Sequence, residues 1–112
     1  MHEYSLVLAL FDRVKEEADR KAARSVRTVV VSVGELSGVE PDLLAQAFII
    51  AKPGTCCADA ELKLERVAAK WLCSSCQAPL TQADELVCER CQAPGRLVQG
   101  GEILLMRVVL EV

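Results

Sequence analysis

Two closely spaced pairs of cysteines in the second half of the chain have the residue type and spacing of metal ligands. Cys73 and Cys76 form one C-x2-C pair, and Cys88 and Cys91 form a second pair after eleven intervening residues. Two residues between cysteines let both thiolates of a tight turn face one point, and two such turns supply the four tetrahedral sulfur ligands that suit Zn²⁺. Because four thiolates close the coordination shell, no position remains for water or substrate. We therefore predict a structural zinc site.

The segment that contains these cysteines, residues 71–96, is compatible with two other interpretations. One is four free thiols in a small core, which fits poorly because the segment has few aliphatic residues. The other is a redox switch that releases zinc on oxidation. Gln77 and Gln92 stand where the turns of zinc ribbons usually have glycine, which weakens the match without removing a ligand. Nucleic-acid binding is disfavoured, because the segment has no basic patch with interleaved aromatic residues.

The remaining cysteines, Cys56 and Cys57, are adjacent and follow Pro53-Gly54 in a predicted loop. Adjacent cysteines cannot easily bind one tetrahedral ion together. We interpret them as loop or partly buried thiols. A vicinal disulfide or an adventitious metal contact is the alternative.

The first three residues, Met1, His2 and Glu3, form a second candidate metal site. A lone histidine near a chain end is most often simply exposed, but Met1 should be retained because aminopeptidases rarely remove it before a large residue. The Met1 amine, the His2 backbone nitrogen and the His2 imidazole can then form fused chelate rings, with the Glu3 backbone nitrogen next in line. Nitrogen ligands in a plane suit Ni²⁺ or Cu²⁺, whereas Zn²⁺ prefers a tetrahedron.

The bulk composition limits what kind of protein carries these sites. With 112 residues, the chain forms one domain, or one domain with a small inserted module. A net charge of −3 gives no general attraction to nucleic acid or anionic membranes. The early apolar segment 4–11 lacks the basic leader and cleavage site of a signal peptide, and no apolar run approaches the roughly 18 residues that span a bilayer. We expect a cytoplasmic protein whose cysteines are reduced or metal-bound.

Hydrophobic periodicity predicts two helices and three strands outside the cysteine segment. The helices are expected at residues 4 to about 24 and from Pro41 to just before Pro53-Gly54, and the strands at 26–33, 61–67 and 102–112. The buried face of the first helix should contain Val7, Leu10, Phe11, Val14 and Ala18, and that of the second Leu43, Leu44, Ala47, Phe48 and Ala51. In the last strand, Leu104, Met106, Val108, Leu110 and Val112 should fill one face, with Arg107 and Glu111 on the other.

These elements predict an α+β fold, a small domain of two helices packed on a three-stranded sheet, with an inserted four-cysteine zinc-ribbon-like module. The helices and strands would form a nickel-binding domain from residues 1–70 plus 97–112. The zinc-binding module would comprise residues 71–96, between the last two strands.

The chain resembles the HypA/HybF hydrogenase nickel-incorporation proteins over essentially its whole length. The resemblance rests on the opening residues 1–5, the turn 33–37, the Glu40-Pro41 helix start, the two C-x2-C pairs and the Gly101-Glu102 dipeptide before the last strand. It implies a nickel metallochaperone with a nickel site around His2 and structural zinc at the four cysteines. It also implies a GTPase partner and delivery of nickel to the large subunit of [NiFe] hydrogenase, with some members serving urease.

The resemblance adds Glu40 to the candidate nickel ligands, although a carboxylate at a helix N-terminus is also stabilised by the helix dipole. Glu3 is expected to orient the site rather than to bind the metal. We predict no enzymatic activity, because the only histidine, His2, is assigned to the metal site and no phosphate-binding glycine loop is present. The chain is expected to be a monomer or homodimer. The rival interpretations are a zinc-ribbon interaction adaptor and a thiol redox sensor.

Overall fold

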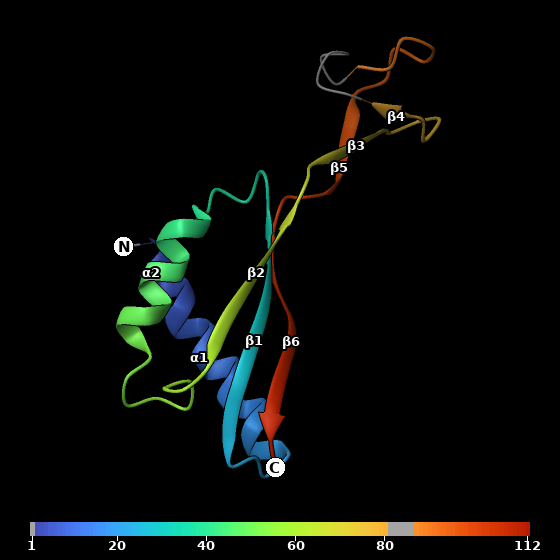
Figure 1. Cartoon of the computed structure of the whole chain (residues 1–112). Helices are drawn as coiled ribbons and strands as arrows, with labels where there is room; N and C mark the ends of the chain where they lie inside the picture. The colour runs from blue at the N-terminus through green and yellow to red at the C-terminus, as the bar shows by residue number, and fades with distance from the viewer. Residues whose placement is uncertain (1, 81–86) are drawn as a thin grey trace.

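The protein is represented by a computed structural model, which describes residues 2–80 and 87–112 but not the side chain of His2 (Figure 1). Its elements follow in the order α1 (His2–Arg20), β1 (Ser25–Gly34), α2 (Pro41–Ala51), β2 (Glu61–Val67), β3 (Lys70–Cys73), β4 (Pro79–Leu80), β5 (Gly95–Gln99) and β6 (Ile103–Glu111). The molecule is elongated, with principal extents of 55 × 28 × 16 Å. Neither described helix is both long and apolar enough to cross a membrane.

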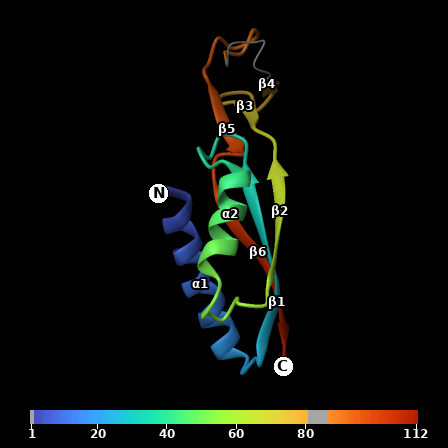
Figure 2. The same ribbon diagram turned by 60° about the vertical axis from the view of Figure 1, so that its left-hand side comes forward.

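The strands form two separate three-stranded sheets. In the first sheet the order is β2-β1-β6, with β2 parallel and β6 antiparallel to β1. Both helices cover one face of this sheet (Figures 1 and 2). The second sheet has the order β4-β3-β5 and is antiparallel. The predicted α+β fold, with two helices on a three-stranded sheet and an inserted cysteine module, is confirmed.

The core lies between the helices and the first sheet. All five residues predicted to face inward from α1 are buried, and the ring of Phe11 meets that of Phe48 edge to face at a centroid distance of 5.4 Å. From α2, Leu44, Ala47 and Phe48 are buried and Ala51 packs against the core. The prediction for Leu43 is wrong, because its side chain is 48% exposed. Leu43 lies about 100° from Leu44 around the helix, so both cannot face the narrow core.

The first helix begins at His2 and ends at Arg20, instead of spanning residues 4 to about 24. Ala22 has a φ of 52°, in the left-handed region that terminates helices. The Ala23 N–H donates to the Ala18 carbonyl oxygen over 2.9 Å, and the Arg24 N–H donates to the Glu111 carbonyl oxygen over 2.7 Å. Pairing with β6 therefore takes the chain out of the helix before its helical sequence pattern ends.

The predicted burial pattern of β6 is wrong in its first half. The pairing with β1 slips between Val30 and Val31, which face Arg107 and Leu105, so Met106 is an extra, bulged residue. The bulge reverses the alternation of faces. As a result Ile103 and Leu105 join Val108 and Leu110 in packing against the core, whereas Leu104 and Met106 are 46% and 54% exposed. The prediction for Val112 is also wrong, because this residue lies beyond the end of the strand at Glu111 and is 78% exposed.

The two sheets are joined at a tightly packed neck where β1 ends. The Leu36 N–H donates to the Gly100 carbonyl oxygen over 2.8 Å, and the Ala69 N–H donates to Glu35 Oε1 over 2.8 Å. A methyl group at Gly34 would overlap the Gly100 carbonyl, and one at Gly100 would lie 2.7 Å from the Ala69 Cα. Glycine at both positions lets the backbones approach closely enough for these hydrogen bonds.

Gly34→Ala is therefore expected to lower the free energy of unfolding by about 3 kcal/mol, because rigid backbone must move to admit the methyl group. Gly38→Ala is the matched control, since its methyl group would meet no atom within 4 Å and only its φ of 79° is unfavourable. That control should cost roughly 1 kcal/mol. Urea unfolding of both variants measures the difference, and equal losses would show that the neck is not closely packed.

Candidate metal centres

The four cysteines of the two C-x2-C pairs converge in the second sheet and its turns. Their Sγ atoms all lie within 4.8 Å of one another, and those of Cys76 and Cys88 are 3.8 Å apart. Zn–S bonds of about 2.3 Å at tetrahedral angles place neighbouring sulfurs roughly 3.8 Å apart. The first cysteine of each pair is buried and the second is exposed. The spacing of the sulfurs therefore fits a tetrahedral zinc ion with only small adjustments.

Each cysteine pair occupies the same kind of backbone turn. The Gln77 N–H donates to the Cys73 carbonyl oxygen over 3.0 Å, and the Gln92 N–H donates to the Cys88 carbonyl oxygen over 2.9 Å. Gln77 and Gln92 have φ values of 64° and 60°, in the left-handed region that favours glycine. A side chain there costs roughly 1 kcal/mol. The turns thus keep the ribbon shape although the usual glycines are missing.

The electrostatics of the four sulfurs also favour a cation. The backbone N–H groups of Cys76 and Ser75 point at Cys73 Sγ, each over 3.4 Å, and lower the pKa of Cys73 to about 6. In contrast, Cys91 keeps its proton through hydrogen bonding to the sulfur of Cys76, which raises the pKa of Cys91 to about 12. Four thiolates this close repel one another, and the positive charge of a bound divalent cation offsets that repulsion and keeps the thiols deprotonated. The donor set therefore fits zinc.

The second candidate site lies where the two helices begin, at the end of the helical layer that is nearer to the second sheet (Figure 1). Met1 and the side chain of His2 lie outside the described residues. Glu3 is half-buried in the first turn of α1, and its Oε2 accepts a long hydrogen bond of 3.5 Å from the backbone N–H of Glu40. Two carboxylate residues that are distant in the sequence therefore meet at one corner.

Glu40 is the N-cap residue of α2, yet its carboxylate makes no capping hydrogen bond. The residue is exposed and lines a cleft of about 440 Å³ between the end of β1, the start of α2 and the end of β2. Its structural role at the helix end is limited to a favourable charge near the helix dipole. The carboxylate is consequently accessible to a ligand at this corner.

The sequence analysis did not identify Glu35, whose carboxylate forms a hydrogen bond at the neck. Its Oε1 accepts from the Ala69 N–H across 34 positions of the sequence. Because every residue except proline has a backbone N–H, the sequence contains no signal that would predict this contact. Glu35 also lines the same cleft as Glu40, and it therefore connects the neck to the loop that leads to Glu40.

Cys56 and Cys57 lie apart from the four-cysteine cluster, in the turn that follows α2. Their sulfurs are 3.8 Å apart, and Cys56 Sγ lies 4.0 Å from the Phe11 carbonyl oxygen. Cys57 is fully buried in the core, and this burial raises the pKa of its thiol to about 12. A thiol that stays protonated at neutral pH is a poor nucleophile. The pair thus matches the interpretation as partly buried thiols, and Cys57 is a poor candidate for a redox-sensing thiol.

Known proteins match nearly the whole length of the chain. A family model described as HypA, hydrogenase/urease nickel incorporation, metallochaperone, matches residues 1–110. The hydrogenase maturation factor HypA of Wolinella succinogenes is 42% identical over 114 residues, covering 99% of this chain and 96% of the relative. The corresponding factor of Aquifex aeolicus is 37% identical, covering 100% and 99%. The solution structure of the Ni metallochaperone HypA from Helicobacter pylori superimposes with a TM-score of 0.77, at 28% identity and 97% coverage of both chains.

Proposed function

Because the chain belongs to the HypA family of hydrogenase and urease nickel-incorporation metallochaperones, we propose that it binds Ni²⁺ at its N-terminus and helps insert it into the large subunit of [NiFe] hydrogenase. The family works in hydrogenase maturation and consists of metallochaperones, a non-enzymatic class. Nickel is the cargo and zinc the resident metal. The observation that supports a nickel site at this end is the contact between Glu3 and the N-cap of α2.

The proposed nickel ligands are the Met1 amine, the His2 backbone nitrogen and the His2 imidazole. Nitrogen donors in a plane favour Ni²⁺ over Zn²⁺. Glu3 takes the orienting role, because its carboxylate already accepts a hydrogen bond from the Glu40 backbone. Glu40 has no capping bond to lose, so its carboxylate is the candidate for an additional ligand. Uptake by backbone nitrogens releases protons, so nickel binding should weaken as the pH falls.

Cys73, Cys76, Cys88 and Cys91 are the proposed zinc ligands, and their sulfur geometry supports this assignment. A closed shell of four thiolates makes the ion structural. Residues 71–96 would then form a zinc-binding module, and residues 1–70 plus 97–112 a nickel-binding domain. The division is supported by the two sheets, which share no strand, and the second sheet extends slightly past these bounds, from Lys70 to Gln99.

The proposed partners are the nickel-handling GTPase of hydrogenase maturation and the hydrogenase large subunit, with urease accessory proteins as further recipients. No phosphate-binding glycine loop occurs in the sequence, so any nucleotide hydrolysis must come from a partner. A metallochaperone must expose its cargo to the recipient. The start of α1 meets this need, since Ser5 is exposed and Tyr4 half-buried beside Glu3.

Elemental analysis of untagged protein after incubation with nickel and gel filtration tests the proposal. We expect one nickel and one zinc per chain, because the two donor sets use different residues and different ligand chemistry. A zinc-ribbon adaptor would hold zinc alone. One zinc with no nickel would therefore reject the metallochaperone assignment, and nickel in place of zinc would reject the separation of the two sites.

A further inference from the structure

The outer edge of β6 is unpaired in the described structure. The sheet order is β2-β1-β6, so β6 forms hydrogen bonds to β1 on one side only. Along the strand Leu104, Met106 and Val109 are 46%, 54% and 38% exposed. A long edge strand with exposed apolar side chains is a template for pairing with another strand, unless charges or a covering element block it.

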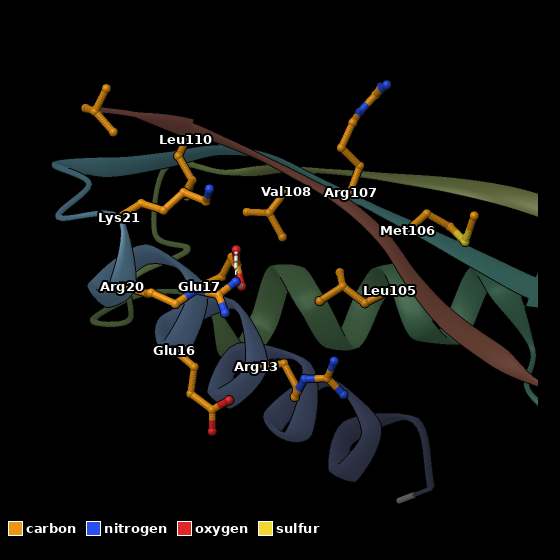
Figure 3. A pocket seen from close by; sticks show the side chains of 11 residues that line it. Arg13, Glu16, Glu17, Arg20, Lys21, Leu105, Met106, Arg107, Val108 and Leu110 are labelled. Carbon is orange, nitrogen blue, oxygen red and sulfur yellow. Dashed lines mark hydrogen bonds and ion pairs between the residues drawn. The ribbon is translucent and has the colours of Figure 1, made fainter.

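The edge adjoins a groove of about 710 Å³ between β6 and α1 (Figure 3). Val108 and Leu110 point from β6 toward the helix, whereas Arg107 points away from it. The helical rim carries charges of both signs, namely Arg13, Glu16, Glu17, Arg20 and Lys21. Because Arg20 is paired with Glu17, the rim has little net charge and would not repel an identical rim.

The charges of β6 are arranged so that the strand is complementary to itself. Arg107 and Glu111 lie two positions on either side of Val109, and all three alternate onto the face directed away from the helices. If two copies of β6 pair antiparallel about Val109, each Arg107 lies opposite the partner's Glu111, and Val108 lies opposite the partner's Leu110. Opposite charges directly across an antiparallel pair stabilise it.

We propose that the protein self-associates through this edge, forming a two-fold dimer in which the two β6 strands pair about Val109 and the sheets join into one. A second copy is the occupant that the charges favour, because the strand carries both Arg107 and Glu111 and so contributes one member to each of the two ion pairs. Such an interface is isologous, as in most homodimers. The paired residues 107–111 lie near the C-terminal end, away from the start of α1 and from the second sheet (Figure 1). Both candidate metal sites would therefore stay accessible in the dimer.

Reversal of the charges tests the register. For the zinc-loaded protein, sedimentation equilibrium over a range of concentrations should give a mass that rises from 12.2 kDa toward twice that value. Arg107→Glu and Glu111→Arg should each weaken the dimer about tenfold or more, because each change replaces two attractive pairs by two repulsive ones. The double variant Arg107→Glu/Glu111→Arg should recover the original affinity, since it restores both pairs with their charges exchanged.

Disulfide cross-linking locates the two-fold axis independently. Val109→Cys should form an intermolecular disulfide with diamide as oxidant, because residues directly opposite each other have a Cα separation compatible with a disulfide. Leu104→Cys is the matched control, as it is similarly exposed on the same strand but would lie roughly 30 Å from its own copy. The zinc content and circular dichroism of every variant should equal those of the unmodified protein.

A mass that stays at that of one chain at all concentrations would overturn the proposal. So would a dimer whose affinity is unchanged by the single charge reversals, or one in which position 104 cross-links as readily as position 109, because the copies would then meet elsewhere.

Discussion

An extension of a few residues ahead of Met1 is expected to weaken nickel binding as severely as His2→Ala does. The extension converts the proposed amine ligand into an amide, and the following backbone nitrogens lose the anchor that makes their deprotonation favourable. Removing a group that merely orients a metal ligand costs about 10- to 100-fold in affinity. Loss of a ligand should cost more, and titration calorimetry with Ni²⁺ measures it directly.

The controls separate a specific effect from a general one. A histidine-free extension after Val112 should leave the nickel affinity unchanged. The N-terminally extended protein, the His2→Ala variant and the C-terminally extended protein should all have the same zinc content. Lowering the pH should weaken nickel binding in the unmodified protein, since the amine and backbone nitrogens must lose protons to bind. Tight binding by the N-terminally extended protein would remove the amine from the site. If His2→Ala also bound normally, the nickel site would have to lie elsewhere in the molecule.

The second large effect is expected from the zinc centre, where Cys91→Ala should release the metal and unfold the cysteine module. Metal binding to such small structural sites contributes on the order of 10 kcal/mol, and this energy is folding energy. Cys91 is an informative position because it is exposed, so truncation of its side chain removes a ligand with little loss of packing. Amide hydrogen exchange should show loss of protection in residues 71–96.

The first sheet and its helices should keep their protection in this variant, because their core contains none of the four cysteines. Cys56→Ala is the matched control, since it removes a thiol outside the cluster and should leave the zinc content at one ion per chain. Loss of protection across the whole chain would contradict a separable module. Retention of zinc by Cys91→Ala would contradict the four-sulfur ligand set.

Local chemistry explains why much of this protein could be predicted from its sequence. The C-x2-C spacing limits each pair to a tight turn, so the proposed ligand set follows from residue positions alone. The inward face of α1 was predicted correctly because helical periodicity places Val7, Phe11 and Val14 on one side. Likewise Pro41 marks the start of α2, since its missing N–H costs nothing at the first helical position.

Errors arose where a side chain's environment depends on a neighbouring element. The β-bulge at Met106 exists only in the pairing of β6 with β1, and it turned the predicted inner face of Leu104 and Met106 outward. Leu43 was predicted to face the core because it is an apolar residue of α2. The core is too narrow for two adjacent leucines of one helix, and it buries Leu44 while Leu43 stays exposed. Gln77 and Gln92 weaken the match to ribbon sequences, yet the turn imposes the left-handed conformation on them.

The groups of this protein that can bind metals are evident in the order of its residues, because ligand type and short-range spacing are properties of neighbouring positions. Which distant groups meet depends instead on how the chain packs. Glu3 contacts the Glu40 backbone across 37 positions, and Glu35 contacts that of Ala69 across 34. Both contacts are made to backbone N–H groups, which every residue except proline possesses. The type of the donor residue therefore does not reveal such a contact. The packing of the helices and the two sheets determines which backbone N–H group each carboxylate meets.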